Sequence, residues 1–146
     1  MGLDMYLEKE VYIGANYEHR QVTGKVDITI KDKHLDIPFN QIATITLDVA
    51  YWRKANQIMN WFTKHPDWDE DRQEVSVYGK DLLDLASLCN TVLADHSKAE
   101  ELLPSMEGFF FGSTDYDEYY FADLQDTVDM LKDTDPQEVY KFTVSW

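Results

Sequence analysis

Alternating apolar and polar residues along four segments predict β-strands with one buried face. The segments are residues 3–13, 25–35, 74–78 and 140–146. Residues 42–49 are also rich in β-branched residues and could form either a further strand or the descent into the next helix. The last segment carries four apolar side chains on one face, at Tyr140, Phe142, Val144 and Trp146. Such a face needs a neighbouring strand, and we expect that neighbour to be the first strand.

Three longer segments repeat their apolar residues with the period of an α-helix instead. Residues 51–64 carry one apolar face and end at a His-Pro pair, which does not continue a helix. Residues 79–94 carry a broad apolar stripe, which indicates deep burial. The third helix extends to Asp133, and we expect Asp115 to be its N-cap because Glu118 then completes a capping box.

The order of these elements predicts an α+β fold in which three main helices pack on a largely antiparallel sheet. A length of 146 residues favours one domain, residues 1–146, and can bury a core without disulfides. Ser97 is expected to cap a further short helix over residues 98–103. The single cysteine, Cys89, lies within the apolar stripe of residues 79–94, so we interpret it as a small buried hydrophobe.

The most unusual stretch is residues 108–121, in which seven of fourteen residues are aromatic. Two glycines, Gly108 and Gly112, bracket three phenylalanines, which predicts either a short strand or a buried loop crossing. Acidic residues follow along the third helix, and we call them the acidic stripe. It consists of Asp115, Asp117, Glu118, Asp123, Asp126, Asp129 and Asp133. Such a stripe either keeps the helix solvated or faces a basic partner.

The charge is unevenly distributed along the chain, which has a net charge of −15. Residues 1–65 hold equal numbers of acidic and basic residues, whereas residues 66–146 hold twenty acids and five bases. An acidic field repels nucleic acid and anionic membranes and attracts basic protein surfaces. We therefore expect a basic protein partner, with no direct nucleic-acid binding and no membrane association.

The sequence carries no recognisable catalytic motif, and we expect a protein that is not an enzyme. It has no phosphate-binding loop, dinucleotide-binding glycine motif, zinc-protease motif or nucleophile elbow. The acidic loop at 67–71 is rich in oxygen ligands but lacks the spacing of a calcium loop, so we interpret it as solvated. No cofactor is evident, but a divalent metal such as Zn could still be held by a histidine and Asp or Glu residues that the fold brings together.

Three segments of the chain are distinctive enough to compare with known families. They are MGLDMYL at residues 1–7, YWRKAN at residues 51–56 and GFFFGSTDYDEYY at residues 108–120. Together they resemble a family of small phage and prophage proteins, and the resemblance covers most of the chain. Relatives in this family often carry histidine at the position of Met59.

The resemblance implies an inhibitor of bacterial defence that acts in the cytoplasm of the infected host. Small acidic phage proteins of this size include type II-A anti-CRISPR proteins, which bind Cas9, and Cas9 has large basic surfaces that grip nucleic acid. We expect the acidic stripe to dock there and to block nucleic-acid loading. Because Trp and Arg are enriched at interface hot spots, secondary candidates for the contact are Trp52, Arg53, Lys54, Asn56 and Trp68.

Two other functions stay open. One is a small metal-dependent phage enzyme, whose site would lie near residues 51–56 and 108–120, where polar groups meet aromatic ones. The other is a phage housekeeping protein without a role in defence.

Overall fold

The computed structural model describes residues 2–20 and 23–146. Within this range the chain forms two compact units. The first unit holds the described residues up to Lys9 together with Asp48–Trp146, and the second unit holds Glu10–Leu47. Every residue of the acidic stripe and all five secondary candidates belong to the first unit.

A four-stranded sheet organises the first unit, with its strands in the order β4-β1-β6-β5. The strands are β1 (Asp4–Tyr12), β4 (Thr44–Arg53), β5 (Glu74–Tyr78) and β6 (Val139–Ser145), of which β1 after Lys9 and β4 before Asp48 belong to the second unit. The terminal strand β6 runs antiparallel to both of its neighbours. Phe142 pairs with Leu7 of β1 on one side and with Val75 of β5 on the other. The predicted pairing of the first and last strands is therefore confirmed.

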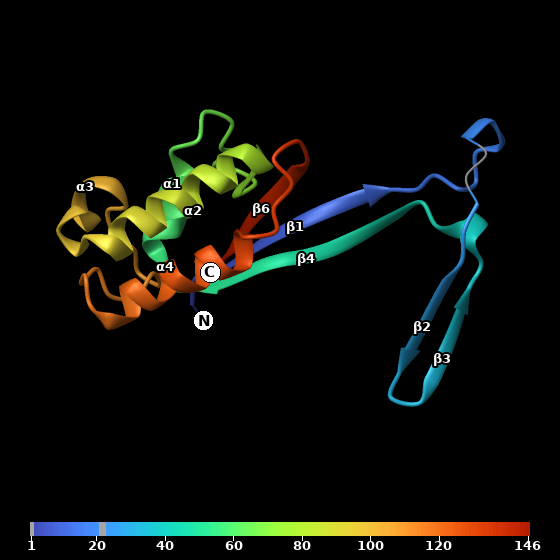
Figure 1. The fold of residues 1–146 in the computed structure, drawn as a ribbon, viewed down its shortest axis with the longest axis horizontal. Helices are drawn as coiled ribbons and strands as arrows, with labels where there is room; N and C mark the ends of the chain where they lie inside the picture. Colours follow the sequence, from blue (N-terminus) through green and yellow to red (C-terminus); the bar gives the residue numbers. More distant parts are fainter. Residues whose placement is uncertain (1, 21–22) are drawn as a thin grey trace. The chain divides into compact units, whose positions relative to one another are not determined.

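The helices of the first unit lie together beside the sheet (Figure 1). They are α1 (Asn56–Thr63), α2 (Gly79–Ala94), α3 (Ala99–Leu102) and α4 (Glu118–Leu131). Helices α2 and α4 pack against each other. The core lies between helices and sheet, where the Phe62 ring stacks on the Phe142 ring with their centroids 3.7 Å apart. The predicted α+β fold with three main helices, α1, α2 and α4, is confirmed.

The predicted helix over residues 51–64 is wrong in its first five residues. Strand β4 continues to Arg53, so Tyr51 and Trp52 are strand residues, and the helix begins only at Asn56. The change of direction occurs at Lys54, whose φ of +57° lies in the left-handed region. The helical spacing of the apolar residues therefore starts at Tyr51, five residues before the helix itself begins.

Two helix starts also differ from the prediction. Helix α4 has Asp117 as its N-cap, because its Oδ1 accepts hydrogen bonds from the backbone N–H groups of Tyr119 and Tyr120. Asp115 lies in the loop before it. Further along the chain, the expected cap at Ser97 is replaced by Asp95, which accepts from the Ser97 backbone N–H and starts a 3₁₀ turn that leads into α3.

The aromatic run is neither a strand nor a wholly buried crossing. Phe109, Phe110 and Phe111 form a turn and bend, in which Phe109 is 95% exposed and Phe111 is 8% exposed. Of the two open alternatives, the loop is therefore closer, but only part of it is buried. Residues 42–49, also left open, are a strand from Thr44 onward.

The second unit contains a β-hairpin where one long strand is predicted over residues 25–35. Its strands are β2 (Val26–Ile30) and β3 (Lys33–Ile37), which pair antiparallel (Figure 1). The two residues between them, Lys31 and Asp32, have φ of 45° and 66°, and tight two-residue hairpin turns use such angles. Alternation alone does not locate this turn, because neither residue is glycine or asparagine.

None of the helices in the described part of the chain is long and apolar enough to cross a membrane.

Candidate functional site

Three segments that are distant in the sequence, around Leu3, Lys54 and Phe110, meet in one place within the first unit. The backbone N–H of Leu3 donates to the Phe110 carbonyl at 3.1 Å. The backbone N–H of Lys54 donates to the Leu3 carbonyl at 2.8 Å. The N-terminal segment thus lies between the end of β4 and the aromatic loop and bonds to both.

Asn56 holds the aromatic loop in place from the first residue of α1. Its side chain is buried, and its Nδ2 donates to the carbonyls of Phe111 at 3.1 Å and Ser113 at 2.8 Å. Its Oδ1 accepts from the backbone N–H of Met106 at 2.9 Å. This candidate is therefore a structural clamp, because all three bonds satisfy backbone groups of a segment without regular structure.

Two adjoining hollows lie between the end of β4 and α4. The first has a volume of about 300 Å³ and is lined by Arg53, Lys54, Gln57, Gly112, Ser113, Asp115, Asp117, Tyr119, Tyr120 and Asp123. The second has a volume of about 480 Å³ and is lined by Tyr51, Trp52, Arg53, Asp123, Asp126, Asp129 and Met130. They share Arg53 and Asp123, which therefore stand where the two hollows meet.

Asp123 is the most perturbed carboxyl group of the site. Its pKa is raised to about 6, mainly by burial, with smaller contributions from the neighbouring carboxylates of Asp126 and Asp117. A hydrogen bond from Gln57 Nε2 to Asp123 Oδ2, 3.2 Å long, acts in the opposite direction by stabilising the charged form. No lysine, arginine or histidine of the described residues forms an ion pair with Asp123.

Arg53 and Lys54 supply the positive charge of the first hollow. Both side chains are exposed. Arg53 lies 3.9 Å from the carboxylate of Asp4, which also accepts a hydrogen bond from the Tyr51 hydroxyl at 2.5 Å. That bond, followed by burial, raises the pKa of Tyr51. Lys54 forms no ion pair with any described residue.

The structure divides the acidic stripe into three environments. Asp117 caps α4, and Asp123 is half-buried at the junction of the hollows. The other five carboxylates are exposed, and they belong to Asp115, Glu118, Asp126, Asp129 and Asp133. Among the described residues none of the seven carboxylates forms an ion pair.

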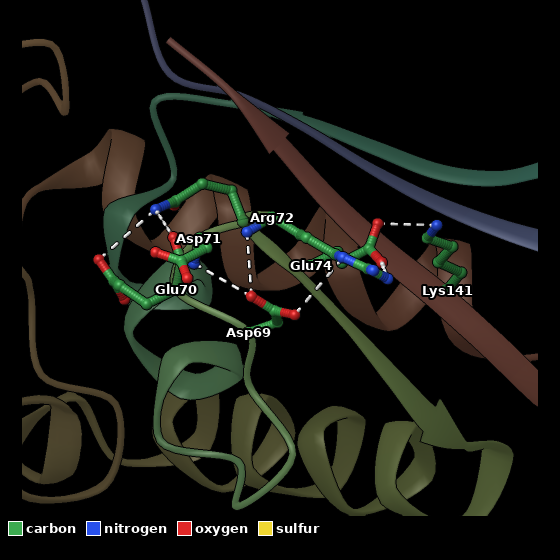
Figure 2. Close-up of polar contacts among 7 residues, drawn as sticks. Asp69, Glu70, Asp71, Arg72, Glu74 and Lys141 are labelled. Atoms are coloured by element: carbon green, nitrogen blue, oxygen red, sulfur yellow. Dashed lines mark hydrogen bonds and ion pairs between the residues drawn. The ribbon is translucent and has the colours of Figure 1, made fainter.

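In the acidic loop around Trp68, unlike in the acidic stripe, a carboxylate lies close to a cationic side chain (Figure 2). There Asp69 Oδ1 accepts from the backbone N–H groups of Asp71 and Arg72, both at 3.0 Å, and the Arg72 side chain lies 3.8 Å from Asp69. Glu74 pairs with Lys141 at 2.7 Å. Asp69 and Glu74 thus have cationic partners, which the carboxylates of the stripe lack among the described residues.

The two tryptophan candidates are mainly structural. Trp52 is buried, and its Nε1 donates to Thr127 Oγ1 at 2.8 Å, which ties β4 to α4. Trp68 is partly buried, packs against the core and donates to Glu70 Oε2 at 2.7 Å. Arg53 and Lys54 are the secondary candidates with exposed charged groups, and of the two only Arg53 has an ion-pair partner among the described residues, Asp4.

Gln57 is the site residue that sequence reasoning misses. It is buried, lines the first hollow and donates to Asp123 and to the Tyr120 carbonyl. The helical period places it on a polar face, away from the core. The hydrogen bonds from Gln57 to α4 hold it in the interior instead, and no local signal in the sequence reports this contact.

No group of three or more His, Cys, Asp or Glu side chains is arranged to hold a metal ion anywhere in residues 2–20 and 23–146. Comparison of the chain with protein-family models, with curated proteins and with solved structures finds no match.

Proposed function

We propose that the protein is a binding protein that recognises a basic protein surface through the acidic stripe and acts by stoichiometric binding rather than turnover. One observation carries this proposal. Some acidic residues elsewhere in the first unit, such as Glu74 and Glu138, have basic partners, whereas no described cation pairs with any of the seven carboxylates of the stripe. A set of uncompensated carboxylates on one helix favours a partner that brings the missing positive charge.

The electrostatics of such contacts predict how binding depends on salt concentration. Charges at the rim of an interface mainly speed association, and salt screens them over about 8 Å at physiological ionic strength. Binding through exposed carboxylates such as Asp126 and Asp129 is therefore expected to weaken as salt is added. The same charges repel phosphate groups, so the partner is a protein and not nucleic acid.

The specific partner that we propose is Cas9, in the cytoplasm of a phage-infected bacterium. The resemblance of residues 1–7, 51–56 and 108–120 to small phage proteins supports this choice, as does the basic nucleic-acid channel of Cas9. An acidic protein bound in that channel blocks loading of the guide or the target.

The test is cleavage of target DNA by purified Cas9 with increasing amounts of the protein, at two salt concentrations. We compare the wild type with a triple variant, Glu118→Lys, Asp126→Lys and Asp129→Lys. These exposed residues have neither a capping role nor a place in the core.

The matched control reverses three exposed acids away from the hollows, with Asp84→Lys, Glu100→Lys and Glu101→Lys. We expect inhibition that saturates near one protein per Cas9, weakens with salt, is lost in the stripe variant and is kept in the control. Absence of inhibition at large excess overturns Cas9 as the partner. Equal loss in both variants shows that total charge matters and overturns the role of the stripe.

A further inference from the structure

The first hollow brings opposite charges together without pairing them. One wall is the end of β4, which contributes Arg53 and Lys54, and the other is the start of α4, which contributes Asp117 and Asp123. Neither Arg53 nor Lys54 forms an ion pair with the two carboxylates of the opposite wall. Opposite charges that line one small space gain energy by contact, so their separation needs a structural cause.

The cause is that hydrogen bonds to neighbouring parts of the first unit hold both walls in place. Asp117 is held by the two backbone N–H groups that it caps, and Asp123 is held by the bond from Gln57. On the other wall, the left-handed backbone of Lys54 is fixed by its hydrogen bond to the Leu3 carbonyl. The two carboxylates and the backbone that carries the two cations are thus held in place by the fold, which lowers the entropic cost of binding a ligand there.

Neutral polar groups complete the lining of the first hollow. Gln57 is buried, and no described residue donates a hydrogen bond to its Oε1. The hydroxyl oxygen of Ser113 accepts from the Asp115 backbone N–H at 3.0 Å, and its proton is available to a further acceptor. Tyr119 also lines the hollow, and its side chain is 73% exposed, so its ring can contact a bound molecule.

We propose that the first hollow binds a small zwitterion of the α-amino acid class. The ligand carboxylate lies against Arg53 and Lys54, and the ligand ammonium group lies against Asp117 and Asp123. The volume of about 300 Å³ is at the lower end of the range for small-molecule sites, which suits a ligand of this size. This binding goes beyond recognition of a basic protein, because it uses Asp117 and Asp123 inside the hollow and not the exposed carboxylates Glu118, Asp126 and Asp129.

A zwitterion fits better than an ion of one sign. A simple cation would approach the carboxylates but would be placed beside Arg53 and Lys54, and a simple anion would meet the opposite problem. A partly buried charge is costly unless it is paired, and a zwitterion pairs with both walls at once. The ligand therefore neutralises the half-buried carboxylate of Asp123, which the protein itself leaves without a cation.

The experiment is an NMR titration of ¹⁵N-labelled protein with each of the protein-forming α-amino acids at millimolar concentration. We expect saturable shifts of backbone amides in the lining, at Gly112, Ser113 and Asp123, and of the Gln57 side-chain amide. For any amino acid that binds, the C-terminal amide and the N-acetyl derivative are tested next. Each derivative lacks one of the two charges, and we expect each to bind at least tenfold more weakly.

Two variants test the two walls, Asp123→Asn and Lys54→Gln, and we expect each to lose at least tenfold in affinity. Their controls are Asp84→Asn and Lys98→Gln, which make the same charge changes at exposed positions outside the hollow. Well-dispersed amide spectra confirm that each variant is folded. Absence of shifts with every amino acid overturns the proposal, as does full binding of either single-charge derivative. Neither result depends on Cas9, so this proposal and the proposed protein partner fail separately.

Discussion

Replacing Asp123 with asparagine is expected to stabilise the protein at neutral pH. Asparagine has the same shape, carries no charge and can still accept the hydrogen bond from Gln57 Nε2. The ordinary pKa of 3.8 rises to about 6 in the fold, mainly through burial, so the charged form of Asp123 is disfavoured there. This interval corresponds to about 3 kcal/mol at full strength. Because the group is partly exposed, solvent screening reduces the expected gain to about 1–2 kcal/mol.

The sign of the pH dependence follows from proton binding by Asp123. Its pKa is higher in the folded state than in the unfolded state, so the folded state holds the extra proton between pH 3.8 and about 6. The wild type therefore loses stability from this group as pH rises through that window, and the loss is complete at pH 7. The asparagine variant has no such group, so its advantage is absent near pH 4, grows as pH rises from there to about 6, and is fully present at pH 7.

The assay is urea unfolding of both proteins at pH 7 and near pH 4, followed by the fluorescence of the four tryptophans. Both proteins share the other charged groups that line the two hollows, so the effects of these groups on stability largely cancel in the difference. They are Arg53, Lys54, Asp115, Asp117, Asp126 and Asp129. The control Asp84→Asn, at an exposed position, is expected to change stability by less than about 0.5 kcal/mol. An Asp123→Asn variant that is less stable at pH 7, or whose advantage is the same at both pH values, refutes the reasoning.

Three further predictions concern the frame of the site. Asn56→Ala removes the bonds to Phe111, Ser113 and the part-buried backbone N–H of Met106. It should cost about 3 kcal/mol in urea unfolding, and a cost below about 1 kcal/mol contradicts the clamp. Gly112→Ala should cost about 1–2 kcal/mol in the same assay, because φ is +84°, and an unchanged midpoint contradicts this strain. Cys89 is buried and its pKa is raised to about 12, so a thiol reagent at pH 8 should modify it only when urea unfolds the protein, and fast modification of the folded protein contradicts that burial.

The regular elements could be predicted from the sequence where one period describes the whole element. The strand Glu74–Tyr78 and the helix Gly79–Ala94 have the predicted bounds, because each buries one side of a uniform pattern. Prediction from the pattern fails where the end of a strand and the start of a helix both fit the same spacing of apolar residues. Tyr51 and Trp52 keep the helical spacing with Ala55 but lie on a strand, and their exposed and buried side chains, respectively, follow the two-residue alternation of β4.

The candidate site could be predicted only as a set of residues and not as an arrangement. Sequence reasoning selects Arg53, Lys54 and the carboxylates of α4, but it contains no information on which of them share a space. That information comes from contacts between distant segments, such as the bonds from Asn56 to the aromatic loop and from Gln57 to Asp123. A local pattern does not encode the identity of a partner more than fifty residues away.

The acidic stripe shows why this distinction matters for experiments. The sequence treats its seven carboxylates as equivalent, but reversing Asp117 removes a helix cap and reversing Asp123 changes a half-buried group. A loss of binding in either variant could therefore come from the fold as well as from the contact. Exposed members such as Asp126 and Asp129 have no such structural role, so only they report on a partner. The two proposals thus need different variants of one helix, with the outer carboxylates for the protein partner and Asp123 for the small ligand.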